Sequence, residues 1–310
     1  MHAHHHDHAR LTANRRALAA ALALVVGFAV VEAVGGVLAG SLALLADAAH
    51  MLGDAAALSL ALFAAWIAGR PATPERSYGF RRAEILAALA NGVALVAIGI
   101  WILVEGVARL RDPAEPLAGW MLAVGVLGLV VNVAVAVVVG RARSGSLNLE
   151  AAFRHVLADL AGSVGVVAAA LVILATGWTR ADALIGLGIG VLVIASSWTV
   201  LRESVGVLLE AAPRGIEPEE VGRAMAAVVG VREVHDLHIW TITSGFPALS
   251  AHVLVAPGAD CHAIRLELER LLHDRFELDH TTLQVEHATA GSQPVELGAA
   301  VRRSGPVGRR

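Results

Sequence analysis

Two short motifs place ionisable residues inside stretches that are otherwise apolar. The first is His50-Met-Leu-Gly-Asp54 and the second is His155-Val-Leu-Ala-Asp159. Residues four apart lie on one face of a helix, so each motif presents an imidazole and a carboxylate together. Two imidazoles and two carboxylates form a four-coordinate set that suits tetrahedral Zn²⁺ and carries the two negative charges that neutralise it. We predict that these four side chains bind one divalent metal ion.

Asp47 lies three residues before His50 and seven before Asp54, on the same helical face. We expect it to orient an imidazole without binding the ion itself. A single polar residue in a span often serves only to hold helices together, and one histidine alone would be equally well explained in that way. A carboxylate near the bilayer centre costs about 2.5–3.5 kcal/mol on insertion scales, so two matching pairs favour ligation. Helix packing, or a hydrogen bond to a metal-binding residue, is favoured over direct ligation for three further polar residues: Glu32, Asn91 and Asn132.

The composition predicts that both motifs lie in a membrane. Hydrophobic residues make up 56% of the 310 positions and charged residues only 16%, whereas soluble chains are usually nearer a quarter charged. A span needs about 20 apolar residues. Six stretches meet this requirement: 17–39, 42–68, 83–108, 117–140, 148–176 and 183–208. The motifs fall in the second and fifth stretches, which run antiparallel, so packing them together would bring the four ligands to one depth.

The arginines of the connecting segments predict the orientation. If the N-terminus is cytoplasmic, the cytoplasmic segments hold nine arginines and the outer loops three, which fits the positive-inside rule. We therefore expect a multi-pass protein of the cell (inner) membrane with both termini in the cytoplasm. The net charge of −3 gives no reason to expect nucleic acid as a partner, and the single cysteine excludes an intramolecular disulfide.

Charges and prolines return from about residue 213, and the pattern there predicts a small α+β domain. Helical spacing covers 215–230 and 260–276, and strand patterns cover 231–243, 248–256 and 280–287. This αββαβ order favours helices on one face of a sheet. We expect four parts: a His-rich cytosolic tail at 1–16, a six-helix transport domain at 17–208, this domain at 213–288 and a disordered tail at 289–310. The small size of the domain favours dimerisation.

The predicted position of the motifs favours transport over catalysis. Secondary transporters hold their cargo between helices near the bilayer midplane, and no His-Glu-x-x-His run with its general base is present. Metal and protons compete for the same imidazole nitrogens, so protons are a natural counter-ion. We predict secondary active efflux of a divalent metal from the cytoplasm and no enzymatic activity. The alternatives are export of Mn²⁺ or Fe²⁺, although two imidazoles argue against Mn²⁺, and a membrane metal sensor or intramembrane hydrolase.

The chain resembles the cation diffusion facilitators, most closely their cobalt–zinc–cadmium resistance and zinc exporter branch. The resemblance covers about residues 17–288 and is carried by GSLALLADAAHMLGDAAAL (40–58), RPATPERSYGFRRAEILAALANG (70–92), SLNLEAAFRHVLADLAGSVGVV (146–167) and VHDLHIWTI (234–242). It implies a transport site made of His50, Asp54, His155 and Asp159. It also implies zinc as the chief cargo, with cadmium or cobalt as further cargo, and a homodimer held by a ferredoxin-like cytosolic domain.

The resemblance further implies a second metal site in the soluble domain. His235 and His252 match ligand positions, Glu286 takes the acidic position on the last strand, and His262 would come from the helix. Zinc bound there would be structural or regulatory. Some members of the family carry another site in the loop between the second and third helices. Residues 69–82 contain neither Asp nor His, so we expect no such site here.

Overall fold

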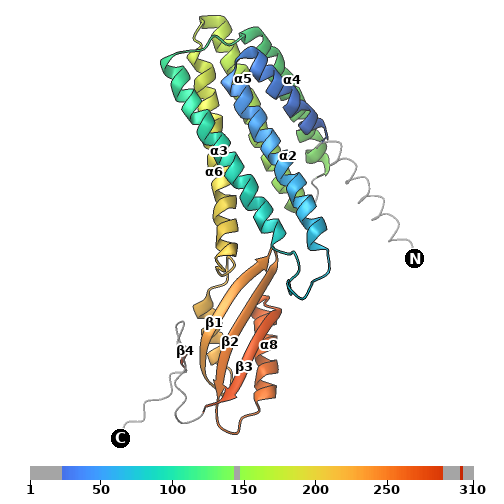
Figure 1. Ribbon diagram of the computed structural model, residues 1–310, viewed down its shortest axis with the longest axis vertical. Coiled ribbons are helices and arrows are strands. Elements are labelled where there is room, and N and C mark those ends of the chain that lie inside the picture. Colours follow the sequence, from blue (N-terminus) through green and yellow to red (C-terminus); the bar gives the residue numbers. More distant parts are fainter. Residues whose placement is uncertain (1–22, 143–146, 289–300, 303–310) are drawn as a thin grey trace, which may run out of the picture. The chain divides into compact units, whose positions relative to one another are not determined.

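The computed structural model describes residues 23–142, 147–288 and 301–302, and they divide into two compact units (Figure 1). The first unit contains the described residues up to Phe63 and from Ala87 to Leu201. The second contains Ala64–Leu86 and the described residues from Arg202 onward. The transmembrane motifs belong to the first unit and the predicted soluble domain belongs to the second.

The first unit is built from long apolar helices. They are Ala23–Ala39, α2 (Leu42–Ala68), α3 (Ala83–Arg111), α4 (Ala118–Ala142), α5 (Leu147–Thr176) and α6 (Arg180–Leu208), and the ends of α2, α3 and α6 extend into the second unit. Helices α2 to α6 each contain a stretch long and apolar enough to cross a membrane. Their ends lie within three residues of the predicted spans. The first predicted span begins at residue 17, so its start lies outside the described residues.

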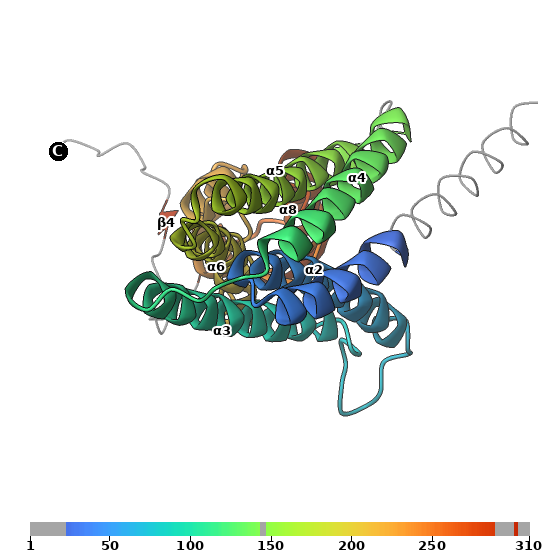
Figure 2. The same ribbon diagram turned by 90° about the horizontal axis from the view of Figure 1, so that it is seen from above.

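Helix α2 takes a central place in this unit. Seen along the helices, it lies between α3 on one side and α4 and α5 on the other (Figure 2). Its residues Leu42, Leu44 and Met51 are buried in the core of the bundle. Large apolar side chains such as Val104 and Leu192 are exposed on the outer faces of their helices. Such an apolar surface is costly in water and suits contact with lipid.

The second unit contains the predicted αββαβ order. Its elements are α7 (Pro218–Ala226), β1 (Val231–Thr243), β2 (Phe246–Val255), α8 (Cys261–Phe276) and β3 (His280–His287). Strands β1 and β2 pair antiparallel, and β2 and β3 pair parallel. Helix α7 is shorter than the predicted 215–230 at both ends. It begins at Pro218, because proline is tolerated in the first turn of a helix but not further inside. It ends before the chain turns into β1 with Gly230 in a left-handed conformation.

The sheet has one more strand than the sequence predicts. The two residues of β4 (Val301–Arg302) pair with Glu233 and Val234 of β1, which gives the order β3-β2-β1-β4. They fall in the stretch that we predict as a disordered tail, and the neighbouring residues 289–300 and 303–310 lie outside the described part of the chain.

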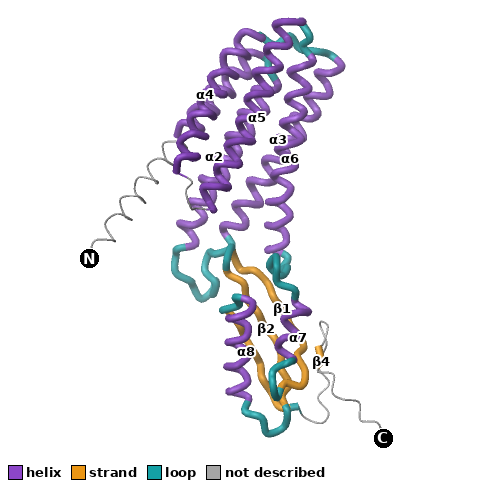
Figure 3. Tube along the Cα trace, turned by 180° about the vertical axis from the view of Figure 1, so that it is seen from behind, coloured by secondary structure: helices purple, strands orange, loops and turns teal. Residues whose placement is uncertain are grey.

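Helices α7 and α8 pack on one face of this sheet (Figure 3). Val234, Val253, Leu268 and Leu272 are buried in the core between the helices and the strands. Successive side chains of a strand point to opposite faces. The neighbouring pair His235 and His252 therefore lies on the face that turns away from the helices.

Candidate metal sites

The first candidate site joins α2 and α5. His50 Nε2 lies 3.7 Å from Asp54 Oδ2, one turn further along α2, and 3.4 Å from Asp159 Oδ1 on α5. One ligand atom from each of these three residues lies within 4.8 Å of the other two. An imidazole nitrogen and two carboxylate oxygens at this separation are a chemically suitable donor set for a divalent transition metal.

The fourth predicted ligand, His155, stands one helical turn before Asp159 in α5. Its side chain lies outside what the structure describes. The spacing of four places it on the same helical face as Asp159, so its role as the fourth ligand stays a prediction. Three of the four predicted residues thus lie together, and the side chain of the fourth is not among those described.

Asp47 is buried next to this group but belongs to a different set of contacts. Its Oδ2 accepts a hydrogen bond from Ser163 Oγ of α5 at 3.2 Å, and Ser163 Oγ in turn accepts one from Asn132 Nδ2 of α4 at 2.9 Å. The carboxyl of Glu32, which is completely buried, lies against that of Asp47. The chain Asn132–Ser163–Asp47 therefore connects three helices beside the ligand group, and the predicted orienting role of Asp47 remains to be tested.

Gly162 allows α5 to approach Asp47 closely. A Cβ atom at this position would stand 2.7 Å from Asp47 Oδ1, which is too close for a nonbonded contact. Ser163 follows directly and donates its hydrogen bond to the same carboxylate. Sequence reasoning missed Ser163, although its spacing of four from Asp159 places it on the ligand face of α5 and would have identified it.

The second candidate site lies on the sheet of the soluble domain. Ligand atoms of His235, Asp236 and His252 also lie within 4.8 Å of one another. His235 and His252 are directly opposite in the β1–β2 register, with their rings 5.4 Å apart. His235 Nδ1 lies 3.8 Å from a carboxylate oxygen of Glu233. Across the described ranges, 23–142, 147–288 and 301–302, this group and the α2–α5 group are the two clusters of at least three metal-ligating side chains.

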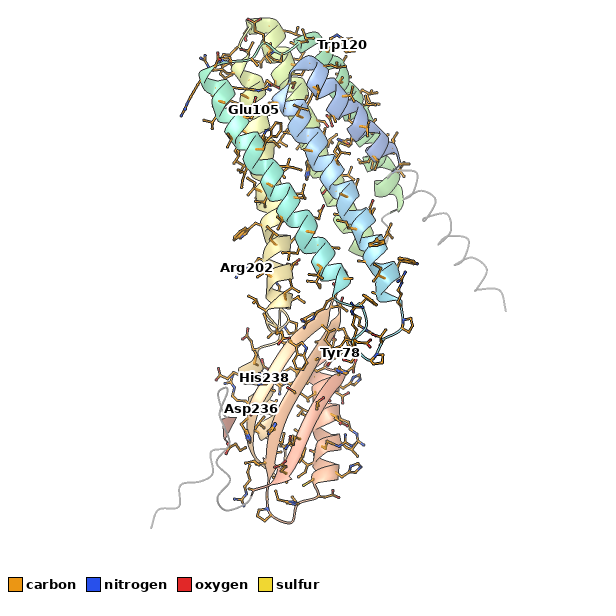
Figure 4. All side chains as sticks on the ribbon, viewed as in Figure 1. Tyr78, Glu105, Trp120, Arg202, Asp236 and His238 are labelled. Carbon is orange, nitrogen blue, oxygen red and sulfur yellow. The ribbon has the colours of Figure 1, made fainter. Side chains whose placement is uncertain are left out.

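Asp236 was not predicted as a ligand, and the reason is local backbone geometry. In a regular strand it would point away from the face that carries His235. The pairing of β1 with β2 shifts between His235 and His238, and Asp236 has the left-handed φ of 49°. Such a bulge redirects side chains and lets neighbouring residues contribute to one site. Figure 4 labels Asp236 and His238 on β1.

The other two residues predicted for the soluble site lie elsewhere in the domain. His262 is in the first turn of α8, where its backbone N–H donates to the capping carboxylate of Asp260 at 2.9 Å. Glu286 is exposed on β3, opposite Leu254, and accepts a hydrogen bond from Gln284 Nε2. Neither belongs to the His235–Asp236–His252 group, so their roles as ligands remain predictions.

Comparisons with known proteins cover both the membrane helices and the soluble domain. Residues 18–209 match the model of the cation efflux transmembrane domain, and residues 213–288 match that of the cation efflux protein, cytoplasmic domain. The chain belongs to the cation efflux family. This is the family of cation diffusion facilitators that the chain resembles in the four quoted segments, and its members are transporters and not enzymes. The protein is therefore a multi-pass membrane protein of metal cation efflux.

Several curated relatives match nearly the whole length of this chain. It is 42% identical to the metal cation efflux system protein CzcD of Cupriavidus metallidurans, over 92% of this chain and 90% of that one. It is 41% identical to the zinc transporter ZitB of Escherichia coli, covering 97% and 96% of the two chains. It is 37% identical to the cadmium, cobalt and zinc/H(+)-K(+) antiporter of Bacillus subtilis, covering 88% and 89%.

A solved structure is also similar to part of the chain. The metal-bound C-terminal domain of the CzcD transporter from Cupriavidus metallidurans is 38% identical, covers 23% of this chain and 99% of its own, and gives a TM-score of 0.22.

Proposed function

We propose that this chain exports zinc, and with it cadmium or cobalt ions, from the cytoplasm in exchange for protons. The transported ion binds His50, Asp54, His155 and Asp159. The observation that supports this most is the convergence of His50, Asp54 and Asp159 from two helices to within 4.8 Å. Relatives named as zinc transporters and as a cadmium, cobalt and zinc antiporter support the choice of cargo.

The chemistry of the ligands explains why protons can serve as the counter-ion. An imidazole must be deprotonated to bind a metal, so protons displace the ion from a site that faces an acidic compartment. A dication with two carboxylates and two neutral imidazoles forms a neutral complex, which lowers the cost of holding charge among apolar helices. Two protons delivered to the emptied imidazoles would likewise balance the two carboxylates. The same four side chains can thus bind one divalent metal ion or two protons without leaving a net charge among the apolar helices.

The soluble domain supplies a second site in this proposal, at His235, Asp236 and His252. It binds the same type of ion and stabilises a homodimer, for which the match to the cytoplasmic domain of the family provides support. Both termini and this domain face the cytoplasm, in accordance with the distribution of arginines.

Uptake of labelled zinc into inside-out vesicles tests the proposal. We expect uptake that is driven by an imposed pH gradient, acid inside, and that is lost in Asp54→Ala and Asp159→Ala. The matched control is His235→Ala, which removes a proposed ligand of the other site and should retain uptake. Uptake that does not depend on the pH gradient would contradict proton exchange. Absence of zinc uptake in wild-type vesicles would favour a metal sensor. Preference for Mn²⁺ or Fe²⁺ over zinc in competition would contradict the assignment of the cargo.

A further inference from the structure

Helix α2 begins at a group of polar residues that belongs to neither metal site. The carboxylate of Asp182, in the first turn of α6, accepts a hydrogen bond from Ser41 Oγ at 2.6 Å. It also accepts the backbone N–H groups of Leu42 at 2.7 Å and of Ala43 at 3.1 Å. Asp182 is only 2% exposed. The start of α2 is thus capped by a residue 140 positions further along the chain.

An arginine of α3 extends this group to a third helix. Arg109 Nη1 donates to the carbonyl of Gly40 at 2.5 Å and lies 3.8 Å from Asp182 Oδ2. Its Nε donates at 2.8 Å to Glu105, which Figure 4 labels on α3. We call the four side chains Ser41, Glu105, Arg109 and Asp182 the polar clamp. It joins the beginning of α2 to the end of α3 and the beginning of α6.

The clamp satisfies backbone groups that the helix cannot satisfy itself. The first N–H groups of a helix have no partner within it, and leaving them unpaired away from water is unfavourable. The hydroxyl of Ser41 accepts the N–H of Leu44 at 3.2 Å, whereas Leu42 and Ala43 depend on Asp182. Hydrogen bonds to an ionised acceptor are stronger than neutral ones. Sliding or turning α2 would break several of them at once.

Close packing between α6 and the start of α2 adds a steric contact to these hydrogen bonds. Gly186 stands one turn after Asp182, and a Cβ atom there would lie 2.9 Å from Leu42 Cγ. Helix α6 also packs against α5, because a Cβ at Gly165 would lie 3.2 Å from Ile185 Cγ2. Helix α6 therefore contacts both of the helices that carry the ligands of the first site.

The polar clamp is close enough to the proposed ligands for a shift at the start of α2 to displace them. His50 follows Leu42 by eight residues, a rise of about 12 Å along the helix. A helix is stiff over this length, so a change at its start moves His50 and Asp54 relative to Asp159. We propose that Asp182 is a positioning residue for the transport site: it fixes α2 so that its two ligands meet Asp159. This inference rests on the proposed function of His50, Asp54 and Asp159.

Zinc binding and transport by the full-length protein test the proposal. Zinc is titrated against a chromophoric chelator, and the loss of binding in the double variant His50→Ala/Asp54→Ala defines the transport-site part. We expect Asp182→Ala to weaken this part about 10-fold, within the range known for residues that support metal ligands. KM in vesicle uptake should rise by a similar factor while the maximal rate is retained, as expected when a change weakens binding alone. Binding at the soluble site should not change. The matched control is Asp112→Ala, an exposed aspartate just after α3.

Two milder variants decide the question if Asp182→Ala does not fold. Ser41→Ala removes one donor and should weaken binding less, and Gly186→Ala should weaken it by pushing Leu42 away. Wild-type affinity and KM in Asp182→Ala, or in both milder variants if that protein is lost, would overturn the proposal. So would a collapse of the maximal rate with unchanged affinity. If His50→Ala/Asp54→Ala itself leaves zinc binding unchanged, the proposed function fails instead, whatever Asp182→Ala does.

Discussion

The two candidate metal-binding groups of this chain combine the same types of side chain on different secondary structure. His235 and His252 stand opposite each other on β1 and β2, whose backbones are hydrogen-bonded to one another. His50 and Asp159 stand on α2 and α5, whose backbone hydrogen bonds run within each helix. The first pair cannot separate without breaking a sheet, whereas the second pair is held together only by packing and by side-chain contacts.

This difference fits the two roles proposed for these groups. A transport site must release its ion, and ligands contributed by separate helices can be drawn apart by a small movement of one helix. A site on paired strands retains its geometry and therefore its ion. The buried contacts of Asp47 and Asp182 show where α2 is held in the present state. The following experiments test whether the two groups differ in this way.

The largest effect is expected from removing a carboxylate of the first site. Asp54→Ala or Asp159→Ala should abolish zinc tolerance in a zinc-sensitive host, since a dication would lose a charged ligand among apolar helices. Plate growth on graded zinc, with protein amounts measured in the membrane fraction, checks this. Unchanged tolerance in either variant would defeat the four-ligand site. His252→Ala is the matched control from the sheet and should keep most of the tolerance.

Removing both histidines of the soluble site should affect stability more than transport. Zinc at 100 times its Kd stabilises a folded protein by about 2.7 kcal/mol through binding. We expect His235→Ala/His252→Ala to lose most of this stabilisation in thermal unfolding of the full chain, with and without zinc. If the zinc-dependent rise in Tm persists in this variant, the His235–Asp236–His252 group is not the retaining site.

A smaller effect is expected for the hydrogen bonds beside the transport site. Ser163→Ala removes the hydroxyl that joins Asn132 to Asp47 and should raise KM for zinc about 10-fold or less. The control is Ser196→Ala on α6, because the Ser196 hydroxyl donates to Val193 of its own helix at 3.0 Å. Equal KM values for the two variants would show that this hydrogen-bond chain does not support the site.

The smallest effect concerns a histidine of the soluble domain outside the metal group. The carboxylate of Asp279 accepts a hydrogen bond from His273 Nδ1 at 2.5 Å, which raises the pKa of His273 above its usual value, and the charge of Asp279 adds to this. A raised pKa stabilises the fold below the unfolded pKa of about 6.5, and this contribution disappears as pH rises through the folded pKa. His273→Gln should therefore lower Tm at pH 6 by no more than about 2 °C, because the pair is exposed. It should not change Tm at pH 9.

A loss of the same size at pH 9 would show that His273 acts through packing and not through its charge. Asp279→Asn should reproduce the pH 6 result, since it removes the partner of the same ion pair.

Much of the fold could be predicted from periodicity and composition. The boundaries of α2, β1 and β3 agree with the prediction to the residue, because long apolar runs and strict alternation dominate these segments. The start of α7 was missed because Pro218 permits helix only from its own position onward. Strand β4 was missed because two residues carry no detectable pattern and form a strand only by pairing with Glu233 and Val234.

Residue spacing indicated the candidate ligands of the membrane domain, since a spacing of four places His50 with Asp54 and His155 with Asp159 on their helices. It could not determine which helices meet, or that Asp236 turns toward His235, or that Asp182 caps a helix 140 residues earlier. Those contacts depend on packing between segments distant in the chain and on one bulge in a strand. Local pattern fixes the face of an element, whereas packing between distant segments determines what that face contacts.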